Sequence, residues 1–475
     1  MQRITKTIIT LFALPILVLG LATYSIAADK IPDLEAIKDE RSLSNPSYVL
    51  GQYWFRKYNG SNALIDFPPA YEYLSNTVSQ LSSYSNLNNK TVETSLLNST
   101  QANAFVLPGN HLFIYSDILS LIKEEDELYA LLAHEISHLE LRHYERRLYN
   151  TEQEKKRLLL LLAAGVAAAI IGKDADTTSA LWIGGIANQA TNQLAYSREN
   201  EQEADRRGRQ LLNNIGIPSG AMTKLFNEFL KNSLGGNKLE FLSTHPLPQT
   251  RLSDSITGES QTPLSTSILE KNNQKQYGFG FFRATLIAYR ALLDDRPYRY
   301  IQNQQLSSDE TLFAQAIVSY QSNSLLNTIE TLNKIELSNR FTDYLLVLTH
   351  IKSNNISKAK RQLNNRLELA PNDPIFAPLL AQLEDNEYLP YSLNEPQFEL
   401  RLKLKSNIDI AVTKEDNTSA LIYKSLMEFN KGKADIAQGL ITRAQKQGGD
   451  KATTDNLLTY YQNILEAEKA SDITP

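Results

Sequence analysis

The segment DELYALLAHEISHLEL, residues 126–141, contains two histidines and a glutamate in the order His134-Glu135-x-x-His138. Apolar residues recur through it at helical spacing, and further leucines lie on the histidine side, so we expect a helix that is buried all round. The apolar stripe consists of Leu128, Leu132, Ile136 and Leu139. Because residues four apart on a helix share a face, His134 and His138 present two imidazoles that suit one tetrahedral zinc ion.

A catalytic zinc ion needs a third protein ligand and an open position for water. The best candidate for this ligand is Glu201, because Asp205 follows it by one helical turn. One of these carboxylates would bind the metal, and the other would accept the outer N–H of a zinc-bound imidazole. We expect Glu203 to point away into solvent, and His143, five residues after His138, to turn away from the metal.

The composition of the chain excludes several classes of partner and site. The chain has 475 residues, of which 42% are hydrophobic and 21% charged, as in packed globular domains. The formal net charge is -5 and there is no long run of lysine and arginine, so nucleic acid is not an expected partner. Cysteine is absent, which excludes disulfides, thiolate metal sites and cysteine nucleophiles, and leaves His, Glu and Asp as metal ligands.

Residues 1–28 have the pattern of a secretory signal peptide. A short basic start precedes an apolar stretch that Pro15 interrupts, and the segment ends in small residues at Ala27 and Ala28. The alternative is an uncleaved membrane anchor, but the proline and the small residues favour cleavage. We therefore expect an exported protein in a bacterial periplasm or an equivalent compartment.

Two regions of different character follow. Residues 29–260 mix helical segments with short strand-like runs, and Pro108-Gly109 between two such runs indicates a turn. We therefore predict an α+β domain that is mainly helical with a small sheet. A polar stretch over 258–276 has the composition of a linker. The remaining region, 261–475, comprises this linker and a part dominated by helical periodicity, which predicts an all-α domain.

The helical part carries a weak repeat. Ser322-Asn323 recurs 31 residues later as Ser353-Asn354, close to the roughly 34 residues of a helix-turn-helix repeat. The order of small and large residues in a tetratricopeptide unit is matched by Ala359, Leu363 and Pro371, and again by Gly432, Ala437, Ile441 and Ala444. This part therefore resembles a tetratricopeptide solenoid, whose concave surface binds extended partners. The alternative is an unrelated helical bundle.

Residues 158–171 form an apolar run that is too short to span a bilayer unaided. A second and shorter apolar run covers 180–187. One hypothesis is a hairpin that contacts the membrane or an apolar client. The alternative is a buried helical hairpin or a self-association surface.

Four features together resemble the gluzincin peptidases, in the branch that includes the CAAX prenyl endopeptidase and the heat-shock membrane protease. They are His134–His138, the spacing of Glu201 and Asp205, Asn103-Ala104-Phe105 before Pro108-Gly109, and residues 243–248, STHPLP. The order of signal peptide, peptidase and tetratricopeptide-like part is most similar to that of a periplasmic member. The resemblance implies a zincin-like metallopeptidase domain that holds one Zn2+ per chain.

By this resemblance His134, His138 and Glu201 are the zinc ligands, Glu135 is the general base, and Asp205 orients a zinc-bound histidine. It also implies a periplasmic endopeptidase with chaperone activity, which degrades unfolded or stalled outer-membrane proteins. The outer-membrane β-barrel assembly machinery would be its partner, through the helical repeats. Because every residue that the hydrolysis requires is present, the sequence favours the enzyme. The alternative is a tetratricopeptide scaffold or chaperone with a blocked or vestigial zinc site.

His245 precedes Pro246 in a predicted loop and is a candidate catalytic residue, either on the open position of the zinc or at the developing oxyanion. We hypothesise that it binds the metal and displaces the catalytic water until the loop moves. The alternative is a loop histidine bonded to nearby backbone. Arg251 would anchor this loop or steady transition-state charge, and we favour anchoring. An extended substrate would add a strand to a sheet edge, and the candidate edge is Leu112–Tyr115, with an ordinary core strand as the alternative.

Overall fold

The computed structural model describes residues 42–61, 63–150, 196–234, 239–247, 249–258, 278–336, 338–385 and 387–471. The predicted signal peptide and both apolar runs lie outside the described residues, as does all but the first residue of the predicted linker. The described residues all belong to one compact unit, residues 39–475, so a domain boundary at 260 stays a prediction. No helix in this part of the chain is long and apolar enough to cross a membrane.

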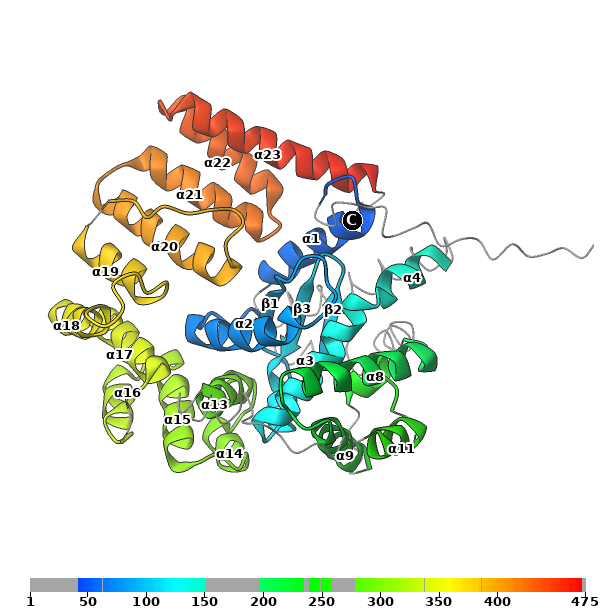
Figure 1. Ribbon diagram of the computed structural model, residues 1–475. Helices are drawn as coiled ribbons and strands as arrows, with labels where there is room; N and C mark the ends of the chain where they lie inside the picture. The colour runs from blue at the N-terminus through cyan, green and yellow to red at the C-terminus, as the bar shows by residue number, and fades with distance from the viewer. Residues whose placement is uncertain are drawn as a thin grey trace, which may run out of the picture. The chain divides into compact units, whose positions relative to one another are not determined.

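The first elements along the chain form a small sheet among helices (Figure 1). Up to residue 150 they are α1 (Pro46–Asn59), α2 (Pro68–Ser83), β1 (Glu93–Leu97), β2 (Ala104–Leu107), β3 (His111–Tyr115), the 3-10 helix η2 (Ser116–Ser120), α3 (Glu125–Glu140) and α4 (His143–Asn150). Between residues 196 and 258 they are α8 (Arg198–Asn214), α9 (Gly220–Leu234), α10 (Glu240–Thr244) and α11 (Gln249–Thr257). The predicted combination of a mainly helical region and a small sheet is confirmed.

The sheet has three strands in the order β1-β3-β2, with β1 parallel and β2 antiparallel to β3. The predicted turn between β2 and β3 is confirmed, and it closes through Gly109 and Asn110, whose φ angles are 81° and 61°. The prediction that Leu112–Tyr115 forms an edge is wrong, because β3 pairs with a strand on each side. Only the antiparallel partner follows from the local turn signal, since a parallel partner is brought in by a longer connection.

Helix α3 is the centre of the metal-binding region. It begins where the Glu127 carboxylate accepts the backbone N–H groups of Lys123 and Glu124 at 2.7 and 3.0 Å, which satisfies donors that a helix start leaves open. Every residue from Asp126 to Leu139 is buried, which confirms the expected all-round burial. The helix packs against α2, α8, α9 and β2 (Figure 1).

From residue 278 the described chain is helical, as predicted, and the helices follow one another, each packed on the next (Figure 1). They are α13 (Gly278–Ala291), α14 (Pro297–Gln302), α15 (Ser308–Gln321), α16 (Leu325–Leu332), α17 (Arg340–Lys352), α18 (Ile356–Leu367), α19 (Phe376–Glu384), α20 (Gln397–Thr413), α21 (Asn417–Asn430), α22 (Ala434–Lys446) and α23 (Lys451–Ala470). Several of these pairs turn through a left-handed residue, among them Asn323, Asn354 and Gly432, with φ of 61°, 58° and 68°. The repeated Ser-Asn therefore marks helix-to-helix turns, while the tetratricopeptide class stays a prediction.

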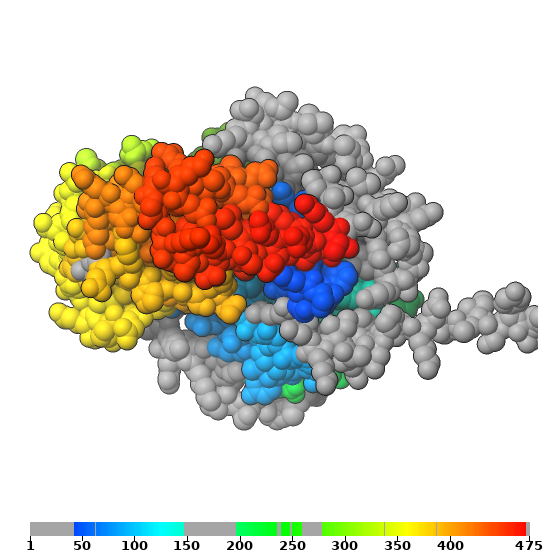
Figure 2. All heavy atoms as spheres, turned by 90° about the horizontal axis from the view of Figure 1, so that it is seen from above, coloured from blue at the N-terminus to red at the C-terminus, as the bar shows by residue number. Residues whose placement is uncertain are grey.

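The helical part returns to the start of the described chain. Arg56 of α1 and Glu468 of α23 form an ion pair in which both side chains are about nine-tenths buried. Ala467 packs against the apolar cluster of α1 that includes Trp54, and Figure 2 shows the end of α23 lying against α1. Phe67, just before α2, stacks with rings of the helical part such as Phe341. One continuous core therefore joins the helices after residue 278 to the region that carries the metal-binding residues.

Candidate metal centre

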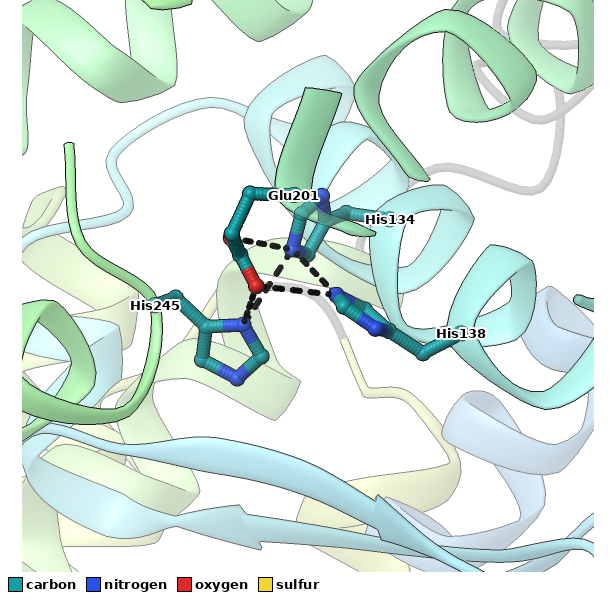
Figure 3. Close-up of side chains that lie close together, drawn as sticks. All are labelled: His134, His138, Glu201 and His245. Carbon is teal, nitrogen blue, oxygen red and sulfur yellow. Dashed lines mark hydrogen bonds and ion pairs between the residues drawn. The ribbon is translucent and has the colours of Figure 1, made fainter. Parts of the chain in front are cut away.

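Four buried side chains from three segments converge on one point (Figure 3). They are His134 and His138 of α3, Glu201 of α8 and His245 after α10, and their ligand atoms all lie within 4.8 Å of one another. The Nε2 atoms of His134 and His138 are 3.0 Å apart. The Nδ1 atom of His245 lies 3.3 Å from His134 Nε2 and 3.1 Å from Glu201 Oε1. The structure thus brings together the three predicted ligands and His245, the residue that we hypothesised to bind the metal as well.

A glycine on α8 allows the two ligand-bearing helices to approach closely. A Cβ atom on Gly208 would lie 3.3 Å from the backbone nitrogen of His134 and 3.0 Å from Met222 Cε. The same face of α8 buries Glu201 and Asp205, which precede Gly208 by roughly two turns and one turn. Close backbone contact at Gly208 therefore sets the distance at which Glu201 reaches the two histidines.

Asp205 and Arg251 contact side chains of the cluster on the side away from the point where these converge. Asp205 Oδ1 lies 2.9 Å from His134 Nδ1, on the opposite side of that imidazole from the cluster. Arg251 donates to both oxygens of Asp205 at 2.7 and 2.8 Å, and its Nη1 lies 2.6 Å from Glu201 Oε2. The same Nη1 donates to the carbonyl oxygen of Pro246 at 2.6 Å. These contacts favour the predicted anchoring role, because Pro246 directly follows His245.

Burial and the charges of the cluster shift the pKa values of its side chains in different directions. Burial lowers the pKa of His134, but hydrogen bonds to two carboxylates outweigh burial and raise that pKa to about 9. Burial lowers the pKa of His138 well below its usual range. Burial alone would raise the pKa of Glu201, but the charges of His245 and Arg251 hold it well below its usual range. A metal ion needs ionised carboxylates and unprotonated nitrogens, so the raised pKa of His134 means that this histidine would release a proton on binding the metal.

Glu135 lies beside the cluster with both carboxylate oxygens buried and, within the described residues, without a hydrogen-bond partner. Its Oε1 is 3.6 Å from His245 Nε2, and burial raises the pKa of this carboxyl group. A buried carboxylate without partners is costly, which indicates that a ligand or water is meant to reach it. Three imidazoles and one carboxylate are also a donor set that zinc takes, so the residues present fit this metal.

Sequence reasoning misjudged Glu203 and His143. Glu203 is not merely solvated, because its Oε2 accepts hydrogen bonds from His143 Nε2 at 3.2 Å and from Arg146 at 3.3 Å. His143 is outside the ligand cluster, as predicted, but it does not turn away. The chain leaves the helix at Arg142, whose φ is 53°, and brings His143 Nδ1 to 2.9 Å from His138 Nδ1.

Tyr196 is a further residue that sequence reasoning missed. Its ring stacks on His138 with centroids 4.1 Å apart and planes at 25°, and it lies 5.5 Å from the ring of His245. Its backbone N–H donates to the carbonyl oxygen of Thr244 at 3.1 Å, which ties it to the loop of His245. Tyr196 belongs to no recognisable motif, so only the three-dimensional structure places it at the centre.

The buried His-Glu-x-x-His helix and the carboxylate that a second helix brings to it form a site of the kind that zinc metallopeptidases have. Residues 69–256 match the model of peptidase family M48. The chain is 27% identical over 239 residues to the β-barrel assembly-enhancing protease of Escherichia coli K12, a match that covers 50% of this chain and 49% of that protein. It is also 27% identical over 216 residues to the mitochondrial metalloendopeptidase OMA1 of Schizosaccharomyces pombe, covering 45% and 59%.

These matches confirm the resemblance to gluzincin peptidases and the closeness to the β-barrel assembly-enhancing proteases. A relative from Yersinia pestis with the same name is 27% identical over 236 residues. The chain spans about half the length of these two bacterial relatives. Zinc is the metal of M48 peptidases, and the cluster of His134, His138, Glu201 and His245 accommodates one ion.

Proposed function

We propose that this chain is a zinc-dependent endopeptidase. The observation that carries the proposal is the Glu135 carboxylate, which is buried beside the His134, His138 and Glu201 donors and accepts no hydrogen bond from the residues that the structure describes. When bound, zinc supplies a Lewis acid that polarises the scissile carbonyl and makes water a nucleophile near neutral pH. Glu135 accepts the proton of the attacking water and passes it to the leaving amine. Asp205 keeps the Nδ1 proton of His134 in place, so that Nε2 faces the metal.

His245 acts as a gate in this proposal. His134, His138, Glu201 and His245 would together hold a tetrahedral zinc ion with no position left for water, so His245 in place would keep the site at rest. The ring of His245 stacks on Phe241 with centroids 4.5 Å apart, and its backbone N–H donates to the Phe241 carbonyl oxygen at 2.7 Å. The His245→Ala variant should therefore hydrolyse peptides faster than wild type. A slower variant would assign His245 to catalysis at the oxyanion instead.

An extended substrate would pair with β2 in place of the strand predicted from the sequence. β2 is an edge of the sheet, and the residues before it lie beside the loop of His245. The carbonyl oxygen of Ala102 accepts a hydrogen bond from the Phe241 N–H at 3.0 Å, and the Asn103 side chain lies 3.5 Å from Thr244 Oγ1. Main-chain pairing along such an edge binds many unfolded sequences without requiring one particular side chain.

For the cellular role, we propose quality control of outer-membrane β-barrel proteins in the periplasm, with degradation of misfolded or stalled chains and chaperone activity. The support is the similarity to β-barrel assembly-enhancing proteases, together with the signal-peptide pattern of residues 1–28. The helices after residue 278 would contact the assembly machinery. A second candidate is a non-catalytic scaffold with a blocked zinc site, and the presence of His245 among the four donors favours it.

Replacing Glu135 by glutamine distinguishes these two functions. Purified wild type should bind one zinc ion and degrade an unfolded protein such as reduced casein, whereas Glu135→Gln should bind zinc and lose degradation by at least 100-fold. The matched control is Glu368→Gln, because Glu368 is an exposed glutamate at the end of α18. If zinc-loaded wild type and the zinc-loaded His245→Ala variant both leave casein intact, the result would favour the scaffold.

A further inference from the structure

A row of side chains linked by hydrogen bonds extends from His138 away from the metal cluster. It consists of His138, His143, Glu203 and Arg146 and is called the file below. His138 uses Nε2 toward the other donors, and its Nδ1 lies 2.9 Å from Nδ1 of His143. The opposite nitrogen of His143 lies 3.2 Å from Glu203 Oε2, to which Arg146 also donates at 3.3 Å. His143 is fully buried, whereas the Glu203 side chain is about 40% exposed. The file therefore runs from the buried cluster to the surface.

Hydrogen bonding fixes where each proton in this file must lie. A metal ion on Nε2 of His138 takes the lone pair of that nitrogen, so the ring proton of His138 lies on Nδ1. Two ring nitrogens 2.9 Å apart share one proton, and Nδ1 of His143 is therefore the acceptor. The proton of His143 then lies on Nε2, where the Glu203 carboxylate accepts it.

The two ligand histidines of α3 thus have different partners behind them. His134 has the carboxylate of Asp205 directly against its outer nitrogen, at 2.9 Å. His138 has an imidazole there, and that imidazole is in turn held by a carboxylate. The contact depends on the left-handed residue Arg142, because a continued helix would carry His143 to another face. A non-glycine residue in this conformation is uncommon, which indicates that the position of His143 is specifically built.

We propose that His143 is a positioning residue for zinc: it fixes the tautomer and ring orientation of His138, and Glu203 and Arg146 fix the tautomer of His143. The inference rests on the proposed function, since it requires that the cluster holds zinc. A partner on the outer nitrogen of a metal-bound histidine orients the ring and typically contributes 10- to 100-fold to metal affinity. A file of this kind makes zinc affinity depend on a surface residue, Glu203, that does not touch the ion.

The test compares His143→Leu, which removes the acceptor, with His143→Asn, whose Oδ1 lies near the position of the lost Nδ1. Zinc dissociation constants are measured by competition with a chromophoric chelator. His143→Leu should weaken zinc binding 10- to 100-fold, and His143→Asn should restore it to within about threefold of wild type. The visible spectrum of the Co2+-loaded protein should change in His143→Leu and return in His143→Asn. The matched control is His350→Leu, because His350 is also a buried histidine but lies on α17.

The outcomes distinguish failure of the positioning role of His143 from failure of the proposed zinc-dependent function. Wild type that binds no zinc would overturn the proposed function itself. Wild type that binds zinc, with His143→Leu within twofold of it, would overturn the positioning role alone. If His143→Leu does not fold, Glu203→Leu decides, because that side chain is partly exposed and its loss still frees the His143 tautomer. Zinc binding weakened at least threefold in Glu203→Leu supports the file, and unchanged binding overturns it.

Discussion

Arg251→Met removes the cation behind the metal cluster while keeping a long, unbranched side chain. Arg251 is 1% exposed, and its guanidinium group contacts two carboxylates, Asp205 and Glu201, and the carbonyl oxygen of Pro246. The guanidinium carbon also lies 5.0 Å from the ring centroid of Phe226, a contact that methionine would partly retain. The substitution therefore tests the charge of the side chain rather than its volume.

The magnitude follows from what Arg251→Met leaves behind. Removing one partner of a buried ion pair typically costs about 3–5 kcal/mol, because the remaining charge stays buried without compensation. Two carboxylates lose their cation here, so we expect the metal-free variant to lose an amount in this range. Zinc bound at Glu201 would replace part of the missing positive charge, so the zinc-loaded variant should lose less.

Urea unfolding of wild type and variant, each with zinc and with a chelator, measures both losses. The control is Arg361→Met, because Arg361 is an exposed arginine of α18 and its loss should change stability by less than about 0.5 kcal/mol. A loss below about 1 kcal/mol in the metal-free Arg251→Met protein would refute the charge argument. An equal loss with and without zinc would refute the placement of the ion at Glu201.

Two further predictions concern the helical part. Burial raises the pKa of Asp373, but Arg340 and hydrogen bonds from two backbone N–H groups outweigh burial and lower that pKa. The stabilisation that this carboxylate gives is therefore complete above a pH of about 4, and it is lost as the pH falls through the lowered pKa. Asp373→Asn should therefore destabilise the protein at pH 7, and the difference from wild type in thermal unfolding should shrink below pH 4. Glu468→Leu should cost about 3 kcal/mol and speed proteolysis at α23, because it leaves Arg56 buried and unpaired. The double variant with Arg56→Met should regain most of that stability, and a double variant as unstable as the single one would contradict this.

The metal-binding helix could be predicted because its signals are local. The apolar stripe, the spacing of His134 and His138, and the i, i+4 relation of Glu201 and Asp205 each follow from 3.6 residues per turn. The convergence of the two helices rests on a chemical expectation, since zinc requires a third ligand, and on the resemblance to known peptidases. The structure adds the close approach at Gly208 that makes this convergence possible.

The errors arose where the chain departs from regular geometry or where distant segments meet. His143 was placed by continuing the helix beyond His138, but Arg142 adopts a left-handed conformation and the chain turns back. Glu203 was judged from its own helix, whereas its partners His143 and Arg146 belong to another one. The sequence does not reveal that β3 is a central strand, because the parallel pairing of β1 leaves no local signal in it.

The contacts of His245 link the proposed gate to the loop that carries this residue. His134 and His138 point Nε2 at the cluster, but His245 points Nδ1, which is the ring nitrogen closer to the main chain. The ring that carries this nitrogen is buried and stacks on Phe241 with centroids 4.5 Å apart, so it can rotate away only if its surroundings move. That loop is held by Arg251 through the carbonyl oxygen of Pro246 at 2.6 Å, and Arg251 also contacts Glu201. In the proposed gate, the Arg251 contact therefore couples the position of the loop to the charge of the metal ligands.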